Sequence, residues 1–263
     1  MSLVFSAVIP HAPIIVPSVG KDNVQKVQRT TESLKEIEYA LYASKPDVLL
    51  IISPHGIVAD DHFTIAFADR YLGTLNEFGD LTTRIERPAE KEMTSRIVER
   101  CKDTGIPVHL VSTQTIDYGT TVPLLFLTKN LPTHTLIPIS YSLLPRDRHI
   151  AFGKSIRHEV LVSTKRVAVI ASGDLAHSTD TTPADGEKPP GRKFDEAVRD
   201  ALENDPKRLT TIDKELTEQA KQCVFRSLLI LLGILDTQRY RFRVLSYESP
   251  FGVGYLSALA NLD

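Results

Sequence analysis

Short, strongly apolar runs separated by segments with helical periodicity are the feature of this sequence that most restricts its fold. The runs VLLII at residues 48–52 and VAVIA at residues 167–171 are apolar on both faces of an extended chain. Strands of this kind belong in the centre of a sheet that helices cover on both sides. We expect strands at residues 3–9, 48–53, 63–68, 108–111, 135–140, 167–171, 240–247 and 254–260.

Segments with apolar residues at helical spacing lie between most of these strands. In the first, Val27, Leu34, Ile37 and Leu41 share one face of a helix. We expect helices at residues 23–44, 90–104, 121–129, 146–163, 192–204 and 214–235. The alternation predicts one α/β domain over residues 1–263, a sandwich whose central, mostly parallel or mixed sheet is flanked by helices on both faces.

The connecting segments carry further expectations. A Ser-Pro-Phe-Gly turn at residues 249–252 should join the last two strands as an antiparallel hairpin. Residues 69–88 and 178–191 have the glycines, prolines and mixed charge of long loops.

Composition excludes several classes of protein. The formal net charge of -2 gives no electrostatic basis for binding nucleic acid or an anionic membrane. No apolar run approaches the roughly 18 residues of a membrane span, and the N-terminal MSLVFSAVIPHAP lacks the basic flank of a signal peptide. The two cysteines, Cys101 and Cys223, have no metal-ligand spacing and are interpreted as reduced thiols. We expect a soluble, cytoplasmic protein.

Three of the eight histidines follow predicted strands directly. His11 comes after the first strand in AVIPHAP, His55 after the second in LLIISPHG, and His177 after the sixth in ASGDLAHS. Loops at the carboxyl ends of strands converge at one edge of an α/β sheet, where ligands bind. Neutral imidazole is the commonest protein ligand for transition metals, so His11 and His55, which share a Pro-His context at equivalent strand ends, are candidate ligands.

Glu248 is the candidate carboxylate ligand, because it ends a strand in SYESPFGVGY. Composition alone would favour a solvated turn residue at this position. Two histidines and one carboxylate on one face of a metal suit Fe(II) and O2 chemistry, because three positions stay open. His177 would then move protons. Asp174 either orients His177 or caps a helix that starts in SGDL.

Other catalytic signatures are absent from the sequence. There is no G-x-S-x-G elbow, no P-loop and no third glycine after Gly252 and Gly254 to complete a dinucleotide-binding fingerprint.

Five short motifs together resemble the LigB-type, class III extradiol ring-cleavage dioxygenases, whose fold is shared by the Memo-like proteins. They are PHAP at His11, SPHG at His55, DYGTTVPL from Asp117 to Leu124, SGDLAH ending at His177, and ESPFGVGY from Glu248. The resemblance implies Fe(II) on His11, His55 and Glu248, with His177 as acid/base residue. Zn2+ would be an alternative metal in the isolated protein.

The resemblance also implies a reaction and partners. The substrates would be O2 and a small aromatic of the catechol or 2-aminophenol type, whose ring is opened beside a hydroxyl. Many family members carry histidine where this chain has Tyr118, and that position is thought to contact substrate or oxygen. Family members often pair with a second subunit, so a homo-oligomer or a missing partner is expected.

Two other functions stay open at this point. One is a Memo-like metal-binding accessory or interaction protein without ring-cleavage activity. Such chains tend to have cysteine in place of the carboxylate ligand, and Glu248 therefore favours the enzyme. The other is a zinc hydrolase on the same scaffold, because two histidines and one glutamate also suit catalytic zinc.

Overall fold

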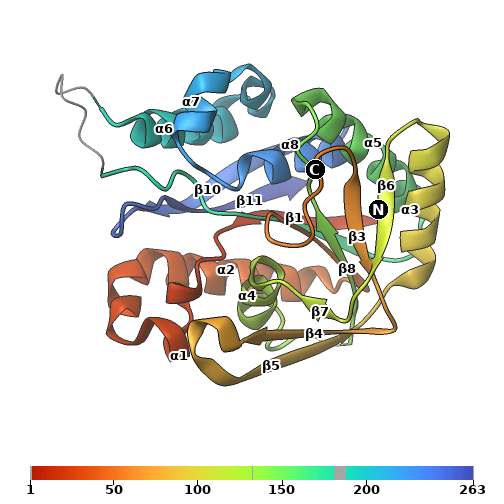
Figure 1. The fold of residues 1–263 in the computed structure, drawn as a ribbon, viewed down its shortest axis with the longest axis horizontal. Coiled ribbons are helices and arrows are strands. Elements are labelled where there is room, and N and C mark those ends of the chain that lie inside the picture. Colours follow the sequence, from red (N-terminus) through yellow and green to blue (C-terminus); the bar gives the residue numbers. More distant parts are fainter. Residues whose placement is uncertain (1, 132, 181–187, 263) are drawn as a thin grey trace.

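A mixed sheet forms the centre of the computed structural model (Figure 1), which describes residues 2–131, 133–180 and 188–262. Its strands are β1 (Leu3–Ile9), β2 (Val48–Ser53), β3 (Phe63–Phe67), β6 (Val108–Ser112), β8 (Thr135–Ser140), β9 (Val167–Ser172), β10 (Tyr240–Glu248) and β11 (Tyr255–Leu262). Their order is β10-β11-β1-β9-β2-β8-β3-β6. The four strands β1, β9, β2 and β8 are parallel, whereas β11 and β3 join them antiparallel. The predicted α/β class and the final β10–β11 hairpin are confirmed.

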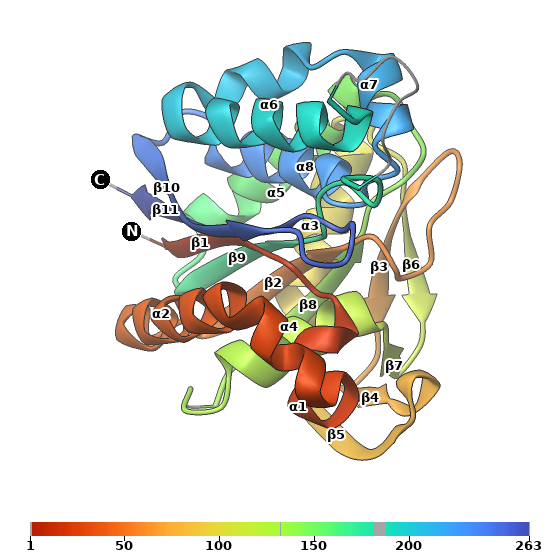
Figure 2. The ribbon, with the colours of Figure 1, turned by 90° about the vertical axis from the view of Figure 1, so that its left-hand side faces the viewer.

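Helices cover both faces of the sheet, as Figure 2 shows. One face carries α3 (Lys91–Asp103), α5 (Arg146–Val162), α6 (Pro190–Asn204) and α8 (Phe225–Leu235). The other carries α2 (Gln28–Ser44) and α4 (Tyr118–Leu127). Three short helices lead into α2, namely η1 (Pro13–Ile15), α1 (Pro17–Gly20) and η2 (Lys21–Val27). Strand β2 shows why its sequence is apolar throughout. Leu50 and Ile52 pack into the core on the first face, and Leu49 and Ile51 into the core on the second.

Helices α5 and α8 cross at a pair of glycines. An added Cβ at Gly153 would lie 2.1 Å from the Ile230 carbonyl oxygen, and one at Gly233 would lie 2.2 Å from the Ile150 carbonyl oxygen. Only glycine allows the two backbones to approach this closely. The interface therefore holds α8 close against α5.

The segment expected to be a long loop at residues 69–88 forms a hairpin instead. It comprises β4 (Arg70–Leu75), η3 (Asn76–Phe78) and β5 (Asp80–Pro88), and β4 also pairs with β7 (Thr115–Ile116). The turn uses Gly79 at φ 80°. Asp80 accepts hydrogen bonds from the backbone N–H groups of Thr82 and Thr83, which holds the polar sequence in register. Part of the other expected loop, 178–191, lies outside the described residues.

The helix expected at residues 214–235 is interrupted, and this prediction was wrong at a position that matters for the site. The chain forms α7 (Lys214–Gln219) after η4 (Pro206–Thr211), then leaves the helix until α8. Lys221 has φ 53°, in the left-handed region. The Gln222 side chain accepts the Phe225 N–H at 2.8 Å and so caps α8. Cys223 consequently lies in a break between helices.

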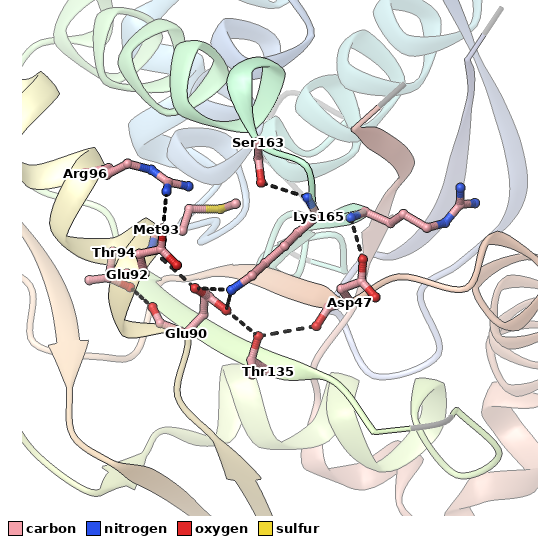
Figure 3. A network of polar contacts seen from close by, with 10 residues as sticks. Asp47, Glu90, Glu92, Met93, Thr94, Arg96, Thr135, Ser163 and Lys165 are labelled. Atoms are coloured by element: carbon pink, nitrogen blue, oxygen red, sulfur yellow. Dashed lines mark hydrogen bonds and ion pairs between the residues drawn. The ribbon is translucent and has the colours of Figure 1, made fainter.

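A partly buried ion pair between Glu90 and Lys165 lies at the end of the sheet where β8 and β9 begin (Figure 3). Glu90 is only 4% exposed, and its carboxylate accepts hydrogen bonds from Lys165 Nζ at 2.7 and 2.8 Å and from Thr135 at 2.9 Å. Burial alone would raise the pKa of Glu90, but these bonds and the Met93 N–H outweigh it and leave the pKa below its ordinary value.

Glu90→Gln is therefore expected to destabilise the protein at pH 7 by about 1–3 kcal/mol. A lowered folded-state pKa stabilises above the unfolded pKa of about 4.3, and that stabilisation is lost as the pH falls through the folded value. The difference between wild type and variant should accordingly shrink on acidification, which urea unfolding at several pH values would measure. Exposed Glu92, paired with Arg96, supplies the control: Glu92→Gln should cost at most about 0.5 kcal/mol. An equal cost for both variants would contradict the assignment.

Candidate metal centre

His11 is held in one orientation by two contacts. Its backbone N–H donates to the Asp174 carboxylate at 3.0 Å, and its Nδ1 lies 2.9 Å from the Ser172 hydroxyl. That hydroxyl donates its own proton to the Gly119 carbonyl at 2.5 Å. Ser172 can therefore only accept from His11, so Nδ1 carries the ring proton. The Nε2 atom of His11 is left with a free lone pair, as a metal ligand requires.

His55 follows β2, which is separated from β1 by β9, and its ring faces His11. The two Nε2 atoms lie 3.1 Å apart, and the His55 Nε2 lies 2.7 Å from the Tyr118 hydroxyl. Burial lowers the pKa of both histidines. Repulsion from His55 lowers the pKa of His11 further, whereas attraction to the Asp117 carboxylate partly restores the pKa of His55. Both rings are thereby favoured in the neutral form that binds metals.

Cys223 is the third donor at this point, and the sequence interpretation missed it. Its Sγ lies 3.5 Å from the His11 Nε2, and the ligand atoms of His11, His55 and Cys223 all lie within 4.8 Å of one another. The interruption between α7 and α8 brings it there. The Cys223 and Val224 N–H groups donate to the Asp174 carbonyl at 3.3 and 3.1 Å, which ties the break to the loop after β9. A short polar stretch, QAKQ, before Cys223 is the signal that could have revealed the break.

Glu248, the predicted carboxylate ligand, is engaged elsewhere. Its Oε1 accepts from the Thr30 backbone N–H at 2.7 Å and from the Thr30 hydroxyl at 2.5 Å. It therefore ties the end of β10 to the start of α2. Among the residues that the structure describes, it does not join the group formed by the two histidines.

Two of the three donor separations suit a single cation directly. Metal–nitrogen bonds of about 2.0–2.1 Å and metal–sulfur bonds of about 2.3 Å allow two such donors to lie up to about 4.4 Å apart. The 3.1 Å between the His11 and His55 nitrogens and the 3.5 Å between the His11 nitrogen and the Cys223 sulfur are within that limit, and the three donors together lie within 4.8 Å of one another. Burial raises the pKa of the Cys223 thiol, so an ion would also be needed to stabilise the thiolate.

Asp174 and His177 support this group from the same loop. Asp174 forms hydrogen bonds to two of the three donor residues: its carboxylate accepts the His11 backbone N–H, and its backbone carbonyl accepts the Cys223 N–H. No helix begins at Asp174, so the helix-capping role considered from sequence is wrong. Burial raises the pKa of the Asp174 carboxyl group to about 7. His177 lies near enough to His11 and His55 to lower the pKa of each, and burial lowers its own.

A cavity of about 420 Å³ opens beside His55 and Tyr118. It lies between the C-terminal ends of β2 and β8 and the β4–β5 hairpin, the region that had been expected to form a loop. The Tyr118 ring stacks on His55 at 4.2 Å and meets Phe78 edge-on at 5.1 Å. Burial raises the pKa of Tyr118, which keeps its hydroxyl protonated. This is a pocket of the size that small organic ligands occupy, next to the three donors.

Comparison with protein families decides the relationship. Residues 6–257 match the model described as the catalytic LigB subunit of aromatic ring-opening dioxygenase. This chain belongs to the LigB family. The resemblance inferred from the five short motifs is thereby confirmed, and LigB dioxygenases depend on a metal.

In the described residues, no helix is both long and apolar enough to cross a bilayer.

Individual LigB relatives are distant. Protein CA_C1420 of Clostridium acetobutylicum is 31% identical over 265 residues, which cover 97% of this chain and 57% of that protein. A 2,3-dihydroxyphenylpropionate/2,3-dihydroxicinnamic acid 1,2-dioxygenase of Photorhabdus laumondii is 25% identical over 196 residues, 68% of this chain and 57% of that protein. The chain thus spans little more than half the length of either relative.

A solved structure shares the fold. The crystal structure of uncharacterized protein JW3007 from Escherichia coli K12 matches with a TM-score of 0.70, covering 98% of this chain and 100% of the other. The two sequences are 18% identical, so the likeness concerns the fold alone.

Proposed function

We propose that this chain is a metal-dependent dioxygenase that opens the ring of a small catechol- or 2-aminophenol-type aromatic. The match to the LigB family model, together with the two histidines that meet beside the cavity, His11 and His55, carries the proposal. Three protein ligands leave positions free for a bidentate substrate and O2. A bound Fe(II) would supply the electron transfer between aromatic ring and O2.

The side chains around the three donors would prepare substrate and oxygen for reaction. His177, favoured in the neutral form, is suited to accept a proton from a substrate hydroxyl at neutral pH and to return it later. The Tyr118 hydroxyl, 2.7 Å from the His55 Nε2, would donate a hydrogen bond to the group that binds next to His55. Asp174 would act as a positioning residue, because it contacts His11 and the Cys223 segment rather than the cavity.

The charge of the cavity supports a neutral or cationic substrate. Asp117 and Glu77 line it, and no lysine or arginine occurs among the described lining residues. Asp117 is held by the Thr120 N–H and by the hydroxyls of Ser53 and Thr120, and no lysine or arginine in the described ranges forms an ion pair with it. A carboxylate on the aromatic would meet repulsion here, whereas an amine would be attracted.

The test begins with anaerobic loading of Fe(II), followed by O2 and a pair of catechols that differ only in the charged group at the end of the same side chain. We expect a yellow ring-opened product, with kcat/KM for dopamine about 10-fold above that for 3,4-dihydroxyphenylpropionate, an advantage of about 1.4 kcal/mol. His177→Ala should retain iron and lose about 10²–10⁴-fold in kcat. If iron-loaded protein consumes no O2 with any catechol or 2-aminophenol, ring opening is refuted.

A second candidate function follows from the thiol. Cys223 stands with the two histidines, which is the arrangement expected of a Memo-like metal-binding protein without ring-cleavage activity. Thiolate ligands favour the binding of zinc and Cu(I), whereas hard cations prefer sites made of oxygen ligands. Tight zinc binding combined with no O2 consumption by the iron form would support this candidate.

A further inference from the structure

A second cavity, of about 620 Å³, lies on the other side of the segment that carries Cys223. Its walls come from the chain after β8, the first turn of α5, α7 and the start of α8. Four cationic side chains line it: Arg146, Lys214, Lys221 and Arg226. Glu218 is the one carboxylate among the described lining residues. This concentration of positive charge stands out in a chain whose formal net charge is -2.

Within the described ranges, three of these four cations lack a directly contacting carboxylate, although Asp213 and Glu218 lie near enough to Arg146 to act on its charge. Lys214 lies 3.8 Å from Glu218. In the described part of the chain, Arg146, Lys221 and Arg226 have no carboxylate oxygen within 4.0 Å. The Arg146 guanidinium donates instead to neutral acceptors, the Ile212 carbonyl at 2.5 Å and the Thr217 hydroxyl at 2.9 Å.

Both arginines are positioned by aromatic rings. The Arg146 guanidinium carbon lies 4.8 Å from the centre of the Phe225 ring, and that of Arg226 lies 5.6 Å from the centre of the Tyr141 ring. Both side chains are half-buried. Stacking fixes a planar guanidinium without using all of its N–H donors, so some remain available to a ligand.

The cavity also has an apolar wall, formed by Leu143, Leu144 and Phe225. The first turns of α5 and α8, helices of 17 and 11 residues, reach it as well. The positive ends of two helix dipoles add to the field of the four cations. An occupant that complements all these features is an anionic group on an apolar body.

We propose that this cavity is a binding site for a small ligand that carries a carboxylate or phosphate on an aromatic or aliphatic body. Recognition would come from Arg226 and Lys221, with Arg146 behind them, and from the apolar wall. The inference does not depend on ring-opening activity, since it concerns a cavity separate from the one beside His55.

Calorimetric titration of the intact chain at low salt tests the site with four probes. Phenyl phosphate and benzoate have both the charge and the apolar body; inorganic phosphate lacks the body and benzyl alcohol lacks the charge. We expect saturable binding of at least one of the first two, about 10-fold tighter than inorganic phosphate, with no binding of benzyl alcohol. The comparison of phenyl phosphate with benzoate identifies the preferred anion.

Variants locate the binding. Arg226→Gln combined with Lys221→Gln should weaken the preferred probe at least about 10-fold, a loss of about 1.4 kcal/mol. Lys35→Gln, an exposed substitution on α2 on the opposite face of the sheet, should leave it unchanged. Arg226→Lys keeps the charge and should weaken binding less than Arg226→Gln; unchanged melting temperatures would show that each variant is folded.

Two results would overturn the site. One is the absence of saturation by any anionic probe below about 10 mM. The other is binding that the double variant leaves unchanged. Binding of a polyanion such as heparin, with none of the small anions, would also count against it, because it would indicate a macromolecular surface.

Discussion

His55→Ala is expected to abolish retention of Fe(II) or Zn2+, and Cys223→Ser to weaken it strongly, whereas Glu248→Gln should leave metal stoichiometry unchanged. The first two changes remove donor atoms from the group that surrounds the His11 Nε2. Their effect should exceed the about 10–100-fold loss that follows when only a supporting residue is replaced. Glu248 binds Thr30, so its loss should affect stability rather than metal affinity.

Metal content after dialysis and competition with a chelator would measure these affinities. Cobalt(II) adds a second readout, because a Co(II)–thiolate bond has a charge-transfer absorption that a carboxylate ligand does not produce. That band should be present in Glu248→Gln and absent from Cys223→Ser. The reverse pattern, in which Glu248→Gln loses metal while Cys223→Ser keeps it, would favour the carboxylate ligand expected from sequence.

Gly153→Val should destabilise the fold by more than about 3 kcal/mol, at or above the upper end of the usual cost of overpacking. Even the first carbon of a side chain would lie 2.1 Å from the Ile230 carbonyl oxygen and 2.8 Å from the Gly233 Cα. Backbone atoms cannot turn aside as a flexible side chain can. Helix α8 would have to move, and Cys223 lies two residues before its first residue.

Urea unfolding would measure this cost, with metal binding recorded on the same samples. Leu161→Val is the matched control, because it places the same β-branched side chain at an exposed position of α5. Its cost should stay within the about 0.7 kcal/mol of helix propensity. Similar unfolding midpoints for the two variants would show that the helices have room to separate.

The periodicity of the sequence was sufficient to predict the sheet and most helices. The apolar runs of β2 and β9 are buried on both faces, as central strands must be, and the histidines lie at the predicted strand ends. The hairpin at residues 70–88 could not be predicted, because its alternation is weak and its register depends on Asp80 accepting N–H groups from the turn.

The third donor could not be predicted from spacing for a related reason. The apolar residues on both sides of Cys223 continue a helical pattern, and only the contact of its backbone with Asp174 accounts for the break. That contact joins segments 49 residues apart in the chain. The motif at Glu248 correctly indicated the family but pointed to a side chain whose partner is Thr30.

The central position of β1 affects how the chain can mature during synthesis. This N-terminal strand lies between β9 and β11, whose residues begin at 167 and 255. Strand β1 therefore acquires both neighbours only after residues as far apart as Leu3 and Leu262 have been synthesised, which makes assembly of this domain slow and non-local. His11 extends from β1, and Cys223 follows it by 212 residues. The candidate donors therefore come together only late in the folding of the domain, and metal capture would report that the sheet has assembled.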